Sequence, residues 1–185
     1  GLITIHGLLP FGAEGLDAPA LEVLPARVFA ESWRDTLRFE LRPNTGGREV
    51  DVISAFLSVD TLLVNVVDQD ASTAGHQPFG VNRDLAGLTL YDSLMAGTDS
   101  VTTGRWLMDL VYFDQAGAVF DGDQVLATIV LVTRGVEGVA HVNVDNLEER
   151  HSAFYRNGVE VGNLVPERTA LLDLRTRATV SGRIL

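Results

Sequence analysis

The stretch from Ala20 to Asp68 restricts the possible folds of this chain more than any other feature. Apolar and charged residues alternate from Leu37 to Arg42, which is the pattern of a strand with one buried and one solvated face. After a Gly-rich turn at residues 44–47, the run from Val50 to Val59 has apolar residues at both odd and even positions. Such a run is typical of a strand in the middle of a sandwich sheet, buried on both faces.

Further segments along the chain have strand patterns, and Gly, Asn and Asp turns separate them. These segments are Leu21–Ala30, Leu62–Val67, Arg105–Phe113, Val125–Leu131, Val139–Asp145 and Ala170–Arg175. Pro25 cannot donate to a ladder, so the first of them is expected at a sheet edge or a break. Asn157-Gly158 stands between β-rich flanks and predicts a type I′ hairpin.

Two segments predict less regular structure. Asp68–Arg83 is polar and rich in turn residues, and we expect a long loop there, the kind of segment in which recognition often resides. Leu85–Met95 fits both helical and alternating spacing, and we interpret it as a strand with a short helical turn.

Strands separated by turns, with no helical repeat, predict an all-β antiparallel two-sheet sandwich. Its single core is expected to contain one large apolar residue from each of the main strands. These are Phe39, Phe56, Leu110, Ile129, Val142 and Leu172.

The order of these segments resembles the cohesin-like modules. The resemblance rests on a Val-x-Pro step at Val23–Pro25, the strand Ala55–Asp60 (AFLSVD) with an LxVV ending at Leu63–Val67, and the strand entry Gly122–Ile129. A Gly turn and strand at Gly135–Val144 follow in the same order. The match covers Ala20 to Arg175.

The resemblance implies a jelly-roll β-sandwich over residues 20–175. Residues 1–19 then form an amino-terminal strand and linker, and residues 176–185 form a carboxy-terminal strand. It further implies a non-catalytic, extracellular or cell-surface module that docks a protein partner or joins a surface assembly. A carbohydrate-binding module is the alternative, because related sandwiches bind glycans, and Tyr91 and Tyr155 would be the residues to substitute in testing it.

The charge of the chain excludes two classes of partner. Its 185 residues carry a net charge of −11, and all 14 basic residues are arginine. Phosphates of nucleic acids and anionic lipid surfaces would be repelled. No run reaches the ~20 apolar residues of a membrane span, so membrane insertion is not expected. Since the chain begins with Gly1 rather than Met, we expect a processed or excised piece from which any signal peptide is gone.

No catalytic signature stands out. The chain has no cysteine, which excludes disulfides and thiol catalysis, and its four histidines lack zinc-site spacing. No Gly-x-Ser-x-Gly motif occurs, and nothing singles out a glycosidase-type carboxylate pair. No cofactor is therefore expected, apart from calcium at Asp114, Asp121 and Asp123, whose carboxylates lie in turns. The alternative is that these acids only form the turns.

The amino-terminal segment suggests a mode of assembly. Ile3 and Ile5 alternate with polar residues in Gly1–Phe11, and Leu8 follows them. This segment could add as a strand to an exposed sheet edge of a neighbouring subunit and build a filament. The alternative is that both terminal segments pair within their own sandwich.

Overall fold

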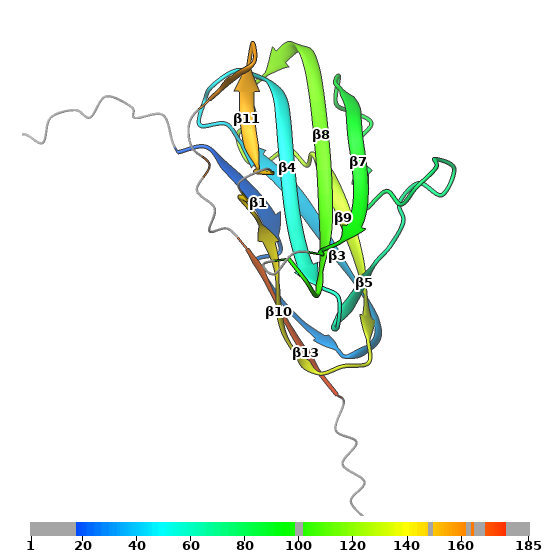
Figure 1. The fold of residues 1–185 in the computed structure, drawn as a ribbon. Coiled ribbons are helices and arrows are strands. Elements are labelled where there is room, and N and C mark those ends of the chain that lie inside the picture. The colour runs from blue at the N-terminus through cyan, green and yellow to red at the C-terminus, as the bar shows by residue number, and fades with distance from the viewer. Residues whose placement is uncertain (1–17, 99–101, 148–149, 162–163, 165–168, 177–185) are drawn as a thin grey trace, which may run out of the picture.

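The computed structural model describes residues 18–98, 102–147, 150–161, 164 and 169–176. The strands are β1 (Ala20–Leu24), β2 (Arg27–Glu31), β3 (Trp33–Asn44), β4 (Val50–Asp60), β5 (Val64–Val66), β6 (Phe79–Val81), β7 (Leu88–Ala96), β8 (Arg105–Ala118), β9 (Ala127–Arg134), β10 (Gly138–Val144), β11 (Ala153–Arg156), β12 (Val159–Glu160) and β13 (Ala170–Arg175). They form two sheets packed face to face (Figure 1), which confirms the predicted all-β sandwich.

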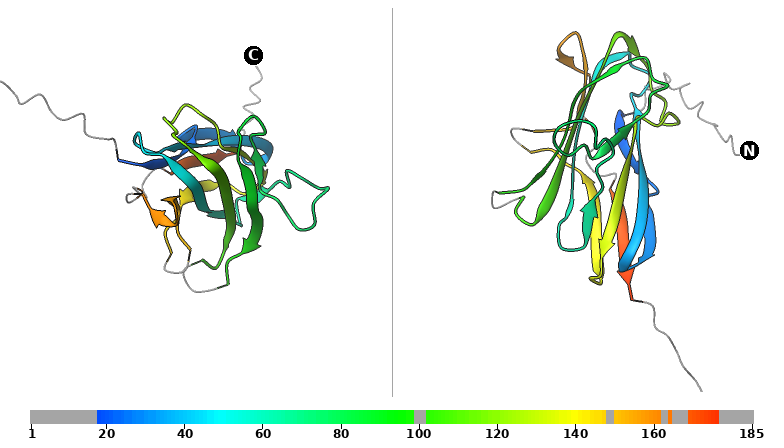
Figure 2. Two further views of the ribbon diagram at one scale, coloured as in Figure 1. Left: turned by 90° about the horizontal axis from the view of Figure 1, so that it is seen from above. Right: turned by 90° about the vertical axis from the view of Figure 1, so that its right-hand side faces the viewer.

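The back sheet has the strand order β1-β3-β9-β5, and β6 also pairs with β9. Its centre is the antiparallel pair β3–β9, in which Phe39 lies opposite Ile129. The front sheet has the order β12-β11-β4-β10-β13-β2, with β8 on the other side of β4 and β7 on β8. The edge-on view in Figure 2 separates the two layers.

Two short strands share one edge of β4. Asn143 and Val144 of β10 pair with Ser58 and Leu57, whereas β11 pairs with β4 farther along, from Ser54 to Val52. The chain therefore leaves the sheet after Asp145 and returns to it at Ser152, beside Phe56. At that point the Asp145 N–H donates to the Phe56 carbonyl (2.8 Å). The Ser152 hydroxyl, in place of a backbone group, accepts from the Phe56 N–H (2.9 Å), and it also donates to the Phe56 carbonyl (3.0 Å).

The strand predicted at Leu21–Ala30 is two strands in different sheets. The peptide bond between Leu24 and Pro25 is cis, and the chain crosses there from β1 in the back sheet to β2 in the front sheet. Pro25 thus lies at a break, as expected. The pairing of β2 with β13 is parallel, which corrects the prediction of a wholly antiparallel sandwich.

The Asn157-Gly158 hairpin is confirmed. Both residues have positive φ, 52° and 76°, as a type I′ turn requires, and β11 pairs with β12 across it. Two other predictions were inaccurate. The long loop at Asp68–Arg83 contains β6, because Phe79 adds to the free side of β9. Leu85–Met95 has no helical turn: an irregular turn leads directly into β7.

The core lies between the sheets and is apolar. Phe39, Leu110, Ile129, Val142 and Leu172 all belong to one cluster of buried side chains, as predicted. Phe56 is the exception. It is only 1% exposed, but its neighbours Ala55 and Leu57 belong to the core cluster and Phe56 does not. Because side chains alternate along a strand, Phe56 points to the outer side of the front sheet.

The first described strand begins at Ala20 and the last ends at Arg175. The predicted terminal strands at residues 1–11 and 178–185, with Ile3, Ile5 and Leu8, lie outside the described residues. In the part of the chain that the structure describes, no helix has the length and apolar character needed to cross a bilayer.

Candidate functional site

The outer side of β7, β8, β4 and β11 forms a continuous four-strand surface, which we call the front face (Figure 1). Its position follows from the register. Ser54 lies opposite Val111, and Ser93 lies opposite Asp109, all on the side away from the core cluster. Polar and charged side chains therefore stand on this face, while the opposite side of the same strands is apolar.

A loop covers the middle of the front face. The outward-pointing Phe56 is almost fully buried, although the sandwich core lies on the other side of its strand. From the contacts of Arg150 and Ser152 we infer that the segment between β10 and β11 supplies the cover. Its Arg150 reaches across to the carboxylate of Asp109 on β8 (Nη1–Oδ2 3.8 Å) and to the sulfur of Met95 on β7 (3.0 Å). The segment thus ties three elements together over Phe56.

The charges near this loop are paired. Arg105 faces Asp145 at 3.8 Å and donates to the Ser58 hydroxyl at 3.4 Å. Burial raises the pKa of Asp109, and the charge of Arg150 opposes that rise. Exposed or half-exposed ion pairs contribute little stability, so these pairs chiefly fix where each charge stands.

A second group of charges stands at the β11 end of the face. Arg156 contacts Glu49 (3.1 Å) and Asp51 (3.8 Å), and the Asn157 N–H donates to Asp51 (2.7 Å). The other Asp51 oxygen, Oδ1, is buried without a partner in the protein. Acidic and basic side chains thus alternate on this part of the face, around the predicted hairpin, and we call this group of charges the mosaic.

His151, which follows Arg150 in the segment between β10 and β11, contacts residues of β11 and β12 at this end of the front face. Its Nε2 lies 3.1 Å from the Tyr155 hydroxyl and 3.7 Å from a Glu160 carboxylate oxygen. Burial raises the pKa of Tyr155, and the charge of Glu160 adds to the rise. Neither contact resembles a nucleophile with its base, and Tyr155 stays a phenol at neutral pH.

Exposed apolar side chains flank the face at both edges. Leu88, Leu90 and Tyr91 on β7 are 66%, 60% and 44% exposed, and Val159 on β12 is 67% exposed. Clustered exposed apolar residues beside a polar surface are typical of protein-binding surfaces. The front face is therefore a candidate protein-binding surface.

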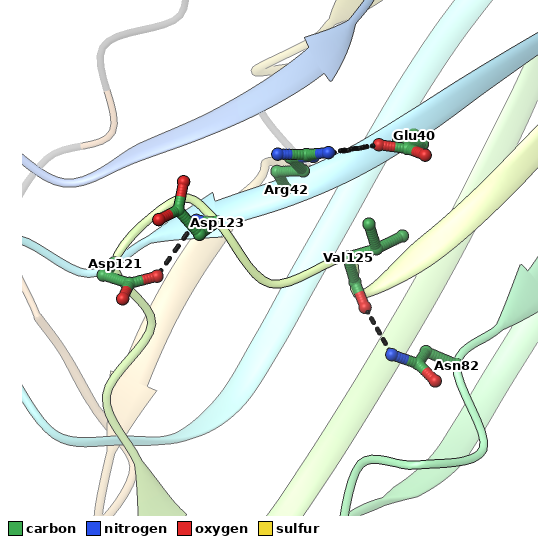
Figure 3. Close-up of polar contacts among 6 residues, drawn as sticks. All are labelled: Glu40, Arg42, Asn82, Asp121, Asp123 and Val125. Carbon is green, nitrogen blue, oxygen red and sulfur yellow. Dashed lines mark hydrogen bonds and ion pairs between the residues drawn. The ribbon is translucent and has the colours of Figure 1, made fainter.

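The calcium candidates do not form one site. The Asp121 carboxylate accepts the Asp123 N–H at 3.0 Å (Figure 3), and Asp114 accepts the Ala116 N–H at 3.0 Å. Each of these two acids thus closes its own turn. No group of three or more His, Asp or Glu side chains close enough to hold a metal occurs among the described residues.

The aromatic residues considered for glycan binding are apart from each other. Tyr91 is on β7 and Tyr155 on β11, and β8 and β4 separate these strands. Trp106 is partly buried and donates its indole N–H to the Val64 carbonyl at 3.1 Å. Trp33 is 66% exposed, but it begins β3 in the other sheet. The described residues therefore show no row of aromatic rings on one strand face.

Sequence reasoning did not find Asp109, Arg150 and His151 as site residues. One signal was present, because Asp109 is the only acidic residue in the apolar run Arg105–Phe113. Its partner Arg150 comes from a distant loop whose course over the sheet no local pattern reveals.

Known proteins resemble this chain in structure but not detectably in sequence. No family model matches the chain, and no curated protein matches it by sequence. Solved structures do. CaCohA2 of Clostridium acetobutylicum aligns with a TM-score of 0.55 and 15% identity, over 85% of this chain and 91% of that chain.

Two further structures match similarly. The seventh ScaB type I cohesin of Pseudobacteroides cellulosolvens aligns with a TM-score of 0.54 and 10% identity, over 91% of this chain and 99% of that one. The third ScaC cohesin of Acetivibrio cellulolyticus, solved in complex with the ScaB dockerin, gives 0.51 and 14%, over 85% and 99%. At such identities the likeness concerns the fold, and it confirms the resemblance found in the sequence: the chain has a cohesin-like fold.

Proposed function

We propose that this chain is a non-catalytic interaction module that binds a protein partner through its front face. The observation that carries the proposal is the combination of a four-strand surface with fixed charges, such as Asp109 and Arg150, and exposed apolar residues along β7. Partners with complementary charges would be recognised by the mosaic, and the apolar edge would be buried on binding. An extracellular or cell-surface assembly is the setting that we propose.

The solved structures support this proposal by analogy. A cohesin of Acetivibrio cellulolyticus was solved with a dockerin, and CaCohA2 was solved in complex with CaDoc0917. A shared fold does not by itself transfer a partner. We therefore propose a dockerin-like protein partner for this chain on the strength of its own front face together with the fold.

The test is affinity capture with matched variants. Wild-type chain, Arg150→Glu and Arg38→Glu are immobilised and exposed to extracts of the source organism and to a panel of purified dockerins. Arg150 stands on the front face, whereas Arg38 is exposed on β3 of the back sheet. We expect one protein or dockerin to be retained by the wild type and by Arg38→Glu but lost with Arg150→Glu. Equal retention by all three folded variants would contradict the proposed face.

The carbohydrate alternative is tested on the same samples. Binding of a polysaccharide that is abolished by Tyr91→Ala or Tyr155→Ala, with no protein captured, would replace the protein-binding proposal. Strand addition by residues 1–11 stays a prediction: deletion of that segment should leave a folded monomer and abolish any polymer seen by light scattering.

A further inference from the structure

A pocket of about 700 Å³ opens on the side of the molecule away from β11. Its walls are β6, the first residues of β7, and the segments that lead into these two strands. Since β6 pairs within the back sheet and β7 within the front sheet, the pocket lies where the two sheets separate. Apolar side chains, Phe79, Val81 and Leu85 among them, form part of its lining.

A buried acceptor in the lining lacks a partner. Gln77 is only 7% exposed, and its Nε2 donates to the Ala74 carbonyl at 3.0 Å. Since a carbonyl only accepts, the bonded end of the amide must be the nitrogen, which leaves the oxygen as the other end. This Oε1 is buried without a hydrogen-bond partner in the protein. A buried acceptor of this kind calls for a donor.

Asp92 supplies a carboxylate to the same pocket. It stands on the inner side of β7, opposite Leu110, and its Oδ1 accepts the Phe79 N–H at 3.4 Å. Burial raises the pKa of Asp92 to about 7, and the charges of Asp68 and Asp70 add to the rise. No positively charged group is among those that shift the pKa of Asp92.

The other charges near the pocket are already engaged. Asp68 accepts the N–H groups of Asp70 and Gln77 and so closes the loop. Asp70 accepts from Ser72 and Thr73, and these bonds, with a smaller contribution from Arg83, lower its pKa. Arg83 also lines the pocket, but its charge acts on the pKa of Asp70 and not on that of Asp92. Asp92 is therefore left as the carboxylate that a positive ligand would neutralise.

We propose that this pocket binds an ammonium or guanidinium group carried on an aliphatic chain. The cation would lie against the Asp92 carboxylate, beside the Gln77 amide, while its methylene groups would contact the apolar lining. A metal ion suits the site less well. Calcium takes six to eight oxygen ligands, and the described residues contain no cluster of three candidate side chains. The pocket borders the β7 edge of the front face, because Leu88, Leu90 and Tyr91 line it as well.

The test uses agmatine, which has a guanidinium and an ammonium group on a four-carbon chain, and isothermal titration calorimetry at pH 8. Butylurea is the neutral probe of similar shape. We expect agmatine to bind and Asp92→Asn to weaken it by about ten- to a hundredfold, which corresponds to loss of one charge-assisted hydrogen bond. Gln77→Met should weaken it by a smaller factor. Asp84→Asn, which removes an exposed charge nearby but outside the lining, should leave the affinity unchanged.

A second arm distinguishes the source of the cation. A capped Gly-Arg-Gly peptide that binds as well as agmatine would assign the pocket to an arginine side chain of a partner. Binding of agmatine alone would assign it to a free small cation. The proposal is overturned if butylurea binds as tightly as agmatine, if Asp92→Asn has no effect, if only Ca²⁺ binds, or if no probe binds at millimolar concentration.

Discussion

The space between the two sheets and the outer side of β4 contain equally buried aromatic residues in different surroundings. Phe39 is fully buried among apolar side chains from both sheets. Phe56 is as well buried, but its cover is one loop anchored by Arg150 and Ser152. A side chain between the sheets can be exposed only by unfolding the sandwich, whereas a side chain under a loop can be exposed by breaking the few polar contacts that hold the loop.

The inner sides of the sheets thus provide stability, whereas the proposed recognition depends on the outer side of the front sheet. The inner faces of β4 and β8 can be apolar throughout because the back sheet always covers them. The outer faces must remain soluble without a partner, and they carry Asp109, Ser54 and Ser93. In the proposed binding mode, the loop over Phe56 would limit how much of this face a partner can reach.

The largest effect is expected between the sheets. Phe39→Ala should lower the free energy of unfolding by about 3–5 kcal/mol, because a close-packed core on all sides cannot collapse into the cavity. Urea denaturation followed by circular dichroism measures it. A loss below ~1 kcal/mol would mean that the described packing around Phe39 is wrong.

Phe56→Ala should cost less, about 2–4 kcal/mol, because the covering loop can settle into the space that the ring leaves. The same urea series measures this variant beside Phe39→Ala. A cost equal to or greater than that of Phe39→Ala would remove the distinction between the two burial environments.

Gly158→Val tests the turn at the edge of the front face. A Cβ at this position meets no atom within 4 Å, so the cost comes from the backbone, whose φ is 76°. We expect a loss of about 1–2 kcal/mol in thermal unfolding. Asn157→Gly is the control, since glycine adopts positive φ freely and should leave the stability nearly unchanged. Equal melting temperatures for wild type and Gly158→Val would place the hairpin elsewhere.

The smallest change in the free energy of unfolding is expected for Asp92→Asn, and this change depends on pH. The folded pKa of Asp92 is raised from 3.8 to about 7, so the unfolded chain releases this proton first and stability falls as the pH rises between these values. The full shift would correspond to ~4 kcal/mol, but Asp92 is only half buried and solvent screens it. We therefore expect Asp92→Asn to stabilise the protein by roughly 1 kcal/mol at pH 8 and hardly at all at pH 4. Urea midpoints at the two pH values measure it. A gain that is independent of pH would contradict the raised pKa.

The fold could be predicted from the sequence where the signal is local. The alternation at Leu37–Arg42, the double-sided apolar run at Val50–Val59 and the Asn157-Gly158 turn each specify one strand or turn, and all three are present. The break at Pro25 was visible as well. Its consequence, a change of sheet and a parallel pair, depends on where the distant β13 lies.

The candidate site could not be predicted in the same way, because its residues come together through long-range contacts. The run Val50–Val59, apolar at both odd and even positions, indicated that both sides of the strand are covered, but the segment that holds Arg150 and Ser152 comes from a distant part of the chain. Likewise, Asp92 and Gln77 meet in one pocket only because β6 and β7 belong to different sheets. The acids that stand out locally, Asp121 and Asp123, form a turn.

The central claim is that the front face is the partner-binding surface, and an NMR footprint tests it most directly. Amide chemical shifts of the 20.0 kDa chain would be recorded with and without the protein recovered by the capture experiment. The account predicts that the shift changes concentrate on β7, β8, β4 and β11 and on the loop around Arg150, with β1, β3 and β9 unaffected. Changes concentrated on the back sheet, with the front face unaffected, would contradict it.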